Sequence, residues 1–544
     1  MSETDSISAS PDDAVQRMRA AAESNDWPQA GLLANAILAQ SPDDLQTLFY
    51  AAMADAALNK WDRAADHLAR LATLVPDMRE VQVQRAHVAQ MRGDIPTMMA
   101  ALSAIVAAAP DDAPANQRLV EVALLFDHPE ARHRLANARV HQPDDAYLAR
   151  IDETLARAAL ATPATPKLVA LVSDTPRVRE AKIARAIKMA GWDVVLLYQR
   201  APVYDPADYF DQSIQYVDCW DAVVKTKALQ PAVCHAVAQM KYETVGALLT
   251  AKPCPVVVDT YDNVAMLGDG FLAANPGRLF DRALEDSVFE RADGYVCRNL
   301  ETQVNIQRGN TQLRGKRLFF PEYCWQGISQ KPKLSEVDGR LHVVHGGSFW
   351  IEKQNPGADG DGGMLWLAEL FDRVGVHFHL YPSGPTPETF EEILSDYRAF
   401  EARSEFFHLH RPIPDIHAFI AEVSAYDIGL MVHRSPLRDG PIWQYADQKY
   451  AYCYGNKLAD FVDANLHVMT LPGFNLFHYL LRHMAIDIAA TPDMFTQEYW
   501  DAVRDRVLAR GIDFDIVQTG FSLEAHAGRL AAFYDRFTSD VETS

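Results

Sequence analysis

A short segment late in the chain combines residue types that can bind a phosphate group. Asn456 and Lys457 precede a helix that we expect over Leu458–Asn465, and Asp460 follows the lysine by one helical turn. A lysine at a helix N-terminus places an ammonium group where backbone N–H groups and the helix dipole already favour an anion. Asp460 can accept a hydrogen bond from a ribose hydroxyl, and the alternative is an ion pair with Lys457.

Two loops after expected strands supply further phosphate-binding candidates. The first loop follows a strand expected over residues 341–345 and contributes Gly346 and Gly347. Its glycines allow the backbone to approach a ligand closely. The second loop follows a strand expected over residues 427–432 and begins with His433 and Arg434. These two residues either contact phosphate or belong to a solvated loop.

Two carboxylates close another expected strand and are candidate general bases. Asp259 ends the strand expected over Val256–Asp259, and Asp262 follows it three residues later. Either carboxylate can take a proton from an attacking hydroxyl, and the alternative is that they cap a helix. Asp174 and Arg177, after the first expected strand, are candidates of the same kind.

Histidines recur with strand spacing but do not predict a metal centre. His377 with His379, and His408 with His410, would each share one face of a strand, as metal ligands can. Since no Cys, Asp or Glu cluster completes a site nearby in the sequence, we interpret them as ordinary strand histidines. The sequence therefore predicts neither a metal ion nor a cofactor.

Strands and helices alternate in two consecutive series, which would position these residues. The strands expected from apolar runs are 167–174, 192–198, 256–259 and 294–297 in the first series, and 341–345, 376–381, 406–410, 427–432 and 467–471 in the second. Strand–helix–strand alternation predicts parallel sheets, whose ligands bind beyond the carboxyl ends of the strands. We expect two Rossmann-like domains, at 167–330 and 331–515, that face each other across a cleft. A helix within 516–544 would pack on either domain.

The first part of the chain is a helical repeat array. Pro42, Pro76, Pro110 and Pro143 recur every 34, 34 and 33 residues, each followed by Asp. This period is typical of tetratricopeptide repeats, in which the proline ends the second helix of each unit. We assign residues 11–160 to the array, 1–10 to a disordered tail and 161–166 to a linker. Such arrays bind other proteins, so a polypeptide partner is expected.

Composition excludes several classes of protein. The chain of 544 residues carries a formal charge of −22, which argues against a nucleic-acid binder. Six scattered cysteines without a C-x-x-C pair, no secretion signal and no long apolar run favour a cytoplasmic protein without a membrane span. The Rossmann glycine fingerprint, the P-loop and the G-x-S-x-G elbow are absent.

The second series resembles the donor-binding half of GT-B glycosyltransferases, which consist of two Rossmann-like domains. The resemblance lies in 426–433, in Asn456-Lys457-Leu458 with Asp460-Phe461, and in 464–470. The loop His345-Gly346-Gly347-Ser348 with Lys353 also resembles the opening loop of this half in the family, which implies that these residues bind the donor. The resemblance departs at Asp460, where the family has Glu, and at Asn465 and His467, where it has Gly and Pro. It implies a metal-independent enzyme that binds a nucleotide sugar at the donor residues named above.

Together with the repeats, the resemblance implies transfer to a Ser or Thr hydroxyl of a protein that the array docks. Bacterial enzymes that modify flagellin share this layout, so flagellin is one expected acceptor. Asp259 or Asp262 would be the base if the reaction inverts configuration. Two alternatives remain open: a transferase of lipid-linked or capsular glycans, and a degenerate fold that serves only as a scaffold.

Overall fold

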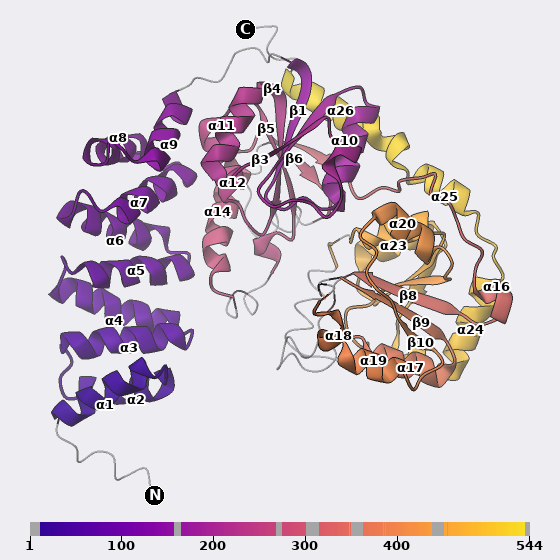
Figure 1. Cartoon of the computed structure of the whole chain (residues 1–544), viewed down its shortest axis with the longest axis horizontal. Helices are drawn as coiled ribbons and strands as arrows, with labels where there is room; N and C mark the ends of the chain where they lie inside the picture. The colour runs from indigo at the N-terminus through magenta and orange to yellow at the C-terminus, as the bar shows by residue number, and fades with distance from the viewer. Residues whose placement is uncertain are drawn as a thin grey trace, which may run out of the picture.

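The computed structural model consists of a helical array followed by two domains with parallel sheets, as the sequence predicts (Figure 1). It describes residues 11–156, 165–267, 275–300, 315–347, 363–383, 388–437 and 455–538, together with 272, 349, 386 and 451–453. The predicted residues Ser348 and Lys353, and the proposed tail at 1–10, lie outside these ranges.

The array is a stack of antiparallel helices. Its helices are α1 Pro11–Glu23, α2 Trp27–Leu38, α3 Leu45–Ala57, α4 Trp61–Leu74, α5 Arg79–Met91, α6 Ile95–Ala108, α7 Ala113–Leu125, α8 Ala131–His141 and α9 Ala146–Ala156. The four recurring prolines follow α2, α4, α6 and α8, which confirms the repeat period. The Asp side chains after three of them cap the next helix, with Asp44 accepting from the Thr47 N–H at 2.8 Å. Met78 takes the equivalent place before α5, which has no side-chain cap.

The first sheet domain contains seven parallel strands in the order β3-β2-β1-β4-β5-β6-β7. Its strands are β1 Thr165–Ser173, β2 Asp193–Tyr198, β3 Gln212–Gln215, β4 Pro231–Gln239, β5 Val256–Tyr261, β6 Gly294–Cys297 and β7 Lys316–Phe319. Its helices are α10 Val178–Met189, α11 Cys219–Leu229, α12 Glu243–Ala251 and α14 Arg278–Arg291, with short 3₁₀ turns at Pro206–Asp208 and Val264–Met266. The sheet is covered on both faces, which explains the continuous apolar run of β1.

The second sheet domain contains six parallel strands in the order β10-β9-β8-β11-β12-β13. Its strands are β8 His342–Gly347, β9 His377–Pro382, β10 Phe407–Leu409, β11 Ile428–Met431, β12 His467–Thr470 and β13 Asp487–Ala489. Its helices are α16 Ser335–Asp338, α17 Leu365–Val374, α18 Phe390–Ile393, α19 Ser395–Glu401, α20 Ile416–Val423, α22 Lys457–Asp463, α23 Asn475–His483 and α24 Gln497–Leu508, with a 3₁₀ turn at Pro492–Phe495.

The chain then returns to the first sheet domain. After α25 Phe514–Gly520, helix α26 Leu523–Thr538 packs against α10 and β4, where the yellow ribbon ends in Figure 1. Of the two domains on which the sequence allowed this helix to pack, the structure selects the first. Because α26 is covalently joined to the second domain, it ties the two domains together.

The array is packed directly onto the first sheet domain. Helices α5, α7 and α9 contact α14, α12 and α11, and the two parts share one apolar core (Figure 1). At Gly93, whose φ is +65°, an added Cβ would lie 2.7 Å from the Leu279 carbonyl oxygen, so only glycine allows this approach. Arg291 also donates to the Leu125 carbonyl at 2.6 Å. The array therefore has a fixed position on the first sheet domain.

Several elements differ from the sequence expectation. Strand β1 begins at Thr165, inside the expected linker, and β3, β4, β7 and β13 were not predicted. The most important of these is β4, because it lies at the centre of the first sheet between β1 and β5. No helix in the described ranges is long and apolar enough to cross a bilayer.

Candidate active site

Lys457 lies where the strand order of the second sheet reverses. The chain adds β9 and β10 on one side of β8, and then returns to place β11 on the other side. In such sheets the ligand site lies at this reversal, beyond the carboxyl ends of the strands. Gly347 ends β8 there, and Lys457 begins α22 opposite it.

The amine of Lys457 is held against the loop after β8. Lys457 Nζ lies 3.4 Å from His345 Nε2. A Cβ added to Gly347 would lie 2.9 Å from Lys457 Nζ. Gly347 has a φ of +110°, a backbone conformation that favours glycine. The structure thus brings together His345, Gly347 and Lys457, which the sequence analysis had selected from separate segments.

The amine of Lys457 is not part of an ion pair among the residues that the structure describes. Burial lowers the pKa of Lys457 to about 8, although the charge of Asp460 opposes the change. A half-buried ammonium group has lost part of its hydration. An anion that binds beside it would replace that lost stabilisation with a direct electrostatic interaction.

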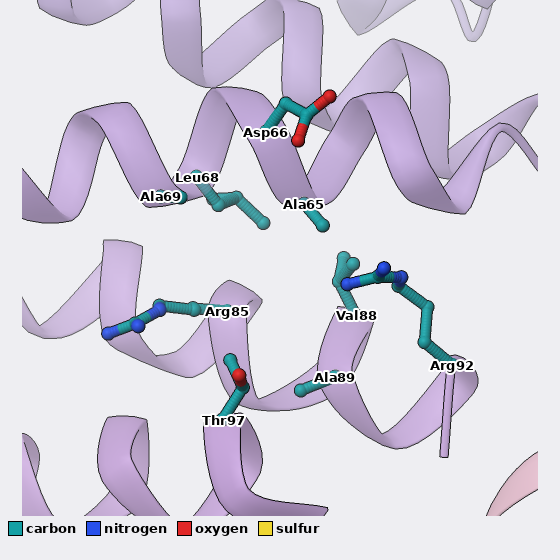
Figure 2. Close-up of a pocket in the computed structure, with 9 residues that line it drawn as sticks. All are labelled: Ala65, Asp66, Leu68, Ala69, Arg85, Val88, Ala89, Arg92 and Thr97. Carbon is teal, nitrogen blue, oxygen red and sulfur yellow. The ribbon is translucent and has the colours of Figure 1, made fainter. Parts of the chain in front are cut away.

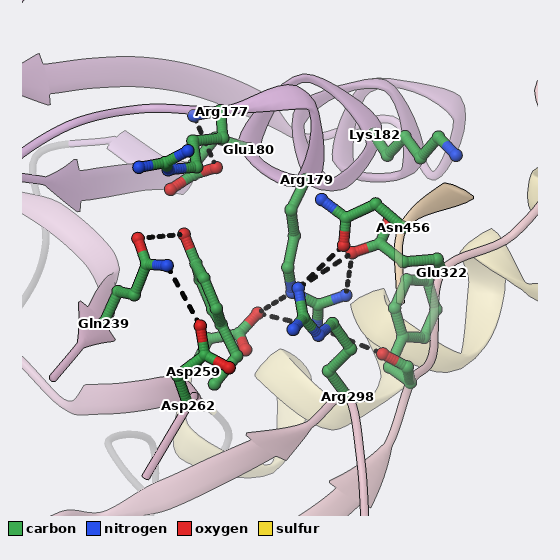
Figure 3. Close-up of polar contacts among 12 residues, drawn as sticks. Arg177, Arg179, Glu180, Lys182, Gln239, Asp259, Asp262, Arg298, Glu322 and Asn456 are labelled. Carbon is green, nitrogen blue, oxygen red and sulfur yellow. Dashed lines mark hydrogen bonds and ion pairs between the residues drawn. The ribbon is translucent and has the colours of Figure 1, made fainter. Parts of the chain in front are cut away.

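The first domain supports the N-terminus of α22. Arg298, which follows β6, donates from Nη1 to Asn456 Oδ1 at 2.7 Å, and its guanidinium lies 4.2 Å from the centre of the Tyr261 ring (Figure 3). Asn456 is the residue before Lys457, so this contact joins the carboxyl edges of the two sheets. The proposed role of Asn456 in donor binding stays a prediction.

His433 and Arg434 follow β11, the neighbour of β8, and therefore lie at the same edge of the sheet. The His433 ring stacks on Phe474 with a centroid distance of 5.3 Å, and Arg434 Nη1 donates to the Ser435 carbonyl at 2.9 Å. Gly346 lies within β8, with the Phe419 ring packed against its backbone. These positions agree with a donor site, and the contacts of these residues with a donor stay predictions.

Asp460 takes part in a contact that sequence reasoning did not foresee. Its Oδ1 accepts from Lys182 Nζ of α10 at 3.0 Å, and both side chains are buried between the domains. Burial raises the pKa of Asp460, and the ammonium of Lys182 opposes the rise. A bond to a ribose hydroxyl would therefore have to coexist with, or replace, the bond to Lys182.

Asp259 lies at the centre of a buried ionic network. Arg179 donates to Asp259 Oδ2 at 2.8 Å and to Glu322 Oε1 at 3.1 Å, and these side chains have exposed fractions of 1%, 0% and 0% (Figure 3). Burial alone would raise the pKa of Asp259, yet Arg179 and His235 hold it below its usual value. An enclosed carboxylate that is already neutralised is poorly placed to take a proton from a substrate.

The same network reaches the C-terminal helix. His235 of β4 lies 3.3 Å from Asp259 Oδ2 through Nε2, and 2.6 Å from the Tyr534 hydroxyl through Nδ1. These contacts connect β4 and β5 with α26. The position of Asp259 is therefore that of a residue that organises the domain interior, and its proposed role as a base stays a prediction.

Asp262 is the more accessible of the two candidate bases. It is half-buried after β5 with a φ of +57°, and its Oδ2 accepts from Gln239 Nε2 at 3.1 Å (Figure 3). Non-glycine residues in this region of φ often occur at functional sites. Glu285 fixes the loop that follows, since its carboxylate accepts from the Val264 and Ala265 N–H groups at 2.7 and 2.9 Å.

The order of the first sheet reverses between β1 and β4, and polar residues lie there too. Asp174 accepts from the hydroxyls of Tyr216 and Thr244. Arg177 precedes α10, and its backbone N–H donates to the buried carboxylate of Glu180 at 2.9 Å. Burial raises the pKa of Glu180 to about 7.

Sequence reasoning missed the charged residues that join the domains. Arg179, Glu180 and Lys182 lie within about one turn of α10 and are all buried. One signal in the sequence could have revealed them. The helix between two apolar strands must pack on the sheet, yet it carries charged residues on the face that becomes buried. Glu322 and Arg298 lie in loops, where no pattern distinguishes them.

Comparisons with known proteins show a likeness only at the level of three-dimensional structure. No family model and no curated protein matches the sequence. An O-GlcNAc transferase mutant from Thermobaculum terrenum aligns over 100% of this chain and 95% of its own, with 16% identity and a TM-score of 0.35. Sucrose-phosphate synthase from Thermosynechococcus elongatus aligns over 69% of this chain and 100% of its own, with 13% identity and a TM-score of 0.44.

The Anabaena protein HepE, solved in complex with UDP-glucose, aligns over the same shares of the two chains, with 12% identity and a TM-score of 0.45. What this chain binds and modifies is inferred from its own residues.

Proposed function

We propose that this protein is a glycosyltransferase that moves a sugar from a nucleotide donor to a Ser or Thr hydroxyl of a protein. The observation that carries the proposal is the Lys457 amine, which lies without a described carboxylate partner at the strand reversal, against the backbone of Gly347. A diphosphate bound there would receive the ammonium charge together with N–H groups at the start of α22.

The chemistry requires charge stabilisation on both sides of the breaking bond. As the sugar leaves its phosphate, positive charge develops on the ring and negative charge on the phosphate oxygens. Lys457, with His345 beside it, would stabilise the leaving group. Asp262, half-buried at the facing edge of the first sheet, would take the proton of the attacking hydroxyl if the reaction inverts configuration.

The repeat array supplies the docking surface for a polypeptide acceptor. Between α4, α5 and the start of α6 it contains a pocket of about 140 Å³, which is large enough for one side chain (Figure 2). Arg92 at this pocket pairs with Asp62 at 3.0 Å, whereas Arg85 forms no ion pair with any described residue. An acidic or amide side chain of the acceptor would fit beside Arg85. Flagellin remains one acceptor of this kind to be tested.

The array cannot be tested by deleting it, because its removal would expose the core that it shares with α11, α12 and α14. A surface variant is the better probe. We would incubate the full chain with radiolabelled nucleotide sugars and a protein extract, and compare the wild type with Arg85→Glu. Arg17→Glu, an exposed charge reversal on α1, is the matched control.

The proposal predicts that label enters protein, is released by alkaline β-elimination, and falls at least fivefold with Arg85→Glu but not with Arg17→Glu. Label that enters only the lipid extract would contradict the protein acceptor and support the lipid-linked glycan alternative. Absence of both turnover and nucleotide binding would contradict the enzyme itself and support a scaffold.

A further inference from the structure

Histidines from three adjacent strands gather on one face of the second sheet. They are His342 of β8, His377 and His379 of β9, His408 of β10 and His410 directly after it. Their rings stack, with centroid distances of 4.5 Å for His342–His377 and 4.5 Å for His379–His408. Residues two apart on a strand share a face, so the pattern His-x-His on neighbouring strands builds this histidine cluster.

One end of the histidine cluster meets a carboxylate. Asp338, the last residue of α16, places Oδ2 2.9 Å from His342 Nε2 and 3.7 Å from His377 Nε2. Its Oδ1 accepts from the Arg340 N–H at 2.9 Å, which fixes the orientation of the group. The three ligand atoms all lie within 4.8 Å of one another. Around a tetrahedral zinc ion with bonds of about 2.0–2.1 Å, such atoms are roughly 3.4 Å apart.

We propose that Asp338, His342 and His377 form a binding site for a divalent transition metal, with zinc as the ion that suits the ligands best. Two imidazole nitrogens and one carboxylate oxygen are a ligand set of the kind that zinc accepts, and they leave a fourth position for water. The side chain of Asp338 is 37% exposed, whereas those of His342 and His377 are 5% and 12% exposed. An ion can therefore enter from the side of the carboxylate.

The surroundings of two of the three ligands shift their pKa values towards the state that a metal binds. Burial, reinforced by His342, lowers the pKa of His377, which favours the neutral imidazole. Burial would raise the pKa of Asp338, but the hydrogen bonds from the Arg340 N–H and from His342 lower it, so the group is a carboxylate.

The other ring nitrogens of both histidine ligands are also supported. His342 Nδ1 lies 3.0 Å from His379 Nε2, and His377 Nδ1 lies 2.9 Å from His408 Nε2. Metal-binding histidines usually donate their second N–H to such a partner, which fixes the tautomer and the ring orientation. The remaining members of the histidine cluster therefore serve as the outer layer of the site.

The site lies at the opposite edge of the sheet from Lys457. Strand β8 runs from His342 to Gly347, a span of about 17 Å for a strand with a rise of about 3.3 Å per residue. The ion would connect α16, the first helix of the second domain, to the starts of β8 and β9. Its expected effect is on stability, and it does not depend on the proposed glycosyl transfer.

The test uses the full chain after removal of any histidine tag and of bound metal. Titration with zinc chloride is expected to show one saturable site, and cobalt(II) to give the intense visible absorption of a four-coordinate ion. Asp338→Asn and His377→Gln should each weaken zinc binding at least tenfold, and His379→Gln by about tenfold through the outer layer. Glu405→Gln, which removes a nearby exposed carboxylate outside the site, should change it less than threefold.

Failure to bind either ion at one equivalent would overturn the proposal. So would zinc binding that Asp338→Asn and His377→Gln leave unchanged, because the ion would then sit elsewhere. Should His377→Gln fail to fold, Asp338→Asn decides the question alone, since this partly exposed side chain contributes little to the core.

Discussion

The two sheet domains have the same kind of strand reversal but differ in the charged groups near it. The buried cation of the first domain is paired with carboxylates, and the half-buried cation of the second domain has no such partner among the described residues. Near the edge of the first sheet, Arg179 is surrounded by Asp259 and Glu322, and the whole group is sealed from solvent. At the edge of the second sheet, Lys457 is half-buried and no described carboxylate pairs with it. In the first arrangement the cation is paired within the protein, although Asp259 Oδ1 is buried without a hydrogen-bond partner among the described residues. The second gains a charged partner only when an anion binds.

This difference separates structural from functional charges. A buried ion pair is costly to break, because either partner alone would remain as an uncompensated charge. A buried cation without a partner is costly to keep, because it has lost water and gained nothing in return. The predictions below test whether each charge behaves as its surroundings indicate.

The largest effect is expected from Arg179→Met, which leaves Asp259 and Glu322 without their cation. We expect the free energy of unfolding to fall by about 3–5 kcal/mol. Denaturation in urea, followed by circular dichroism, measures the change, with Arg17→Met on the exposed face of α1 as the control. A loss below about 1 kcal/mol would show that the network is not structural.

The next largest effect is expected from substitutions of the two candidate bases, which should have different consequences. Asp262→Asn should lower kcat by about 100-fold or more at unchanged stability, because a general base commonly contributes this factor. Asp259→Asn should instead lower the melting temperature, since it removes the charge that balances Arg179. Turnover and thermal melting are measured on both variants. Equal kcat for wild type and Asp262→Asn would exclude Asp262 as the base.

Lys457→Met should stabilise the free protein while it removes nucleotide binding. The pKa of this lysine falls from its usual 10.5 to about 8 in the folded state, and each unit corresponds to about 1.4 kcal/mol. Folding therefore carries a penalty that is fully present below pH 8 and disappears as the pH rises towards 10.5. A gain of about 1–3 kcal/mol at pH 7 is expected. A loss of stability on substitution would contradict the unpaired state of this lysine.

The smallest effect is the pH dependence of nucleotide affinity. A bound diphosphate would raise the pKa of Lys457, so binding should be constant below about pH 8 and weaken above it. Isothermal titration between pH 6.5 and 9.5 would show the change, and in Lys457→Met the dependence should disappear. A profile that stays flat in the wild type would mean that this amine does not meet the phosphate.

The sequence predicted those parts of the molecule whose structure depends on one short segment of the chain. The recurring prolines define the array, since each acts within its own helix pair. Gly347 and Lys457 could be selected because strand ends and helix starts carry local signals. Lys182 could not be matched with Asp460, because the pair forms only when the two domains pack together.

The same limit explains the histidines. The pairs on β9 and β10 were visible in the sequence, but Asp338 and His342 belong to other elements, and the register between β8 and β9 brings them together. Strand β4 was overlooked although it is central, because the short apolar run that contains His235 follows a proline and lacks the strong β-branched pattern of β1 and β5.

The central claim is that Lys457 receives the phosphate of a nucleotide donor. The most direct measurement is thermal melting of the wild type and Lys457→Met with UDP, GDP, dTDP and CMP. One nucleotide at 100 times its dissociation constant should stabilise the wild type by about 2.7 kcal/mol and leave the variant unchanged. If no nucleotide shifts the wild type, or if the variant shifts equally, the donor site is not where Lys457 lies.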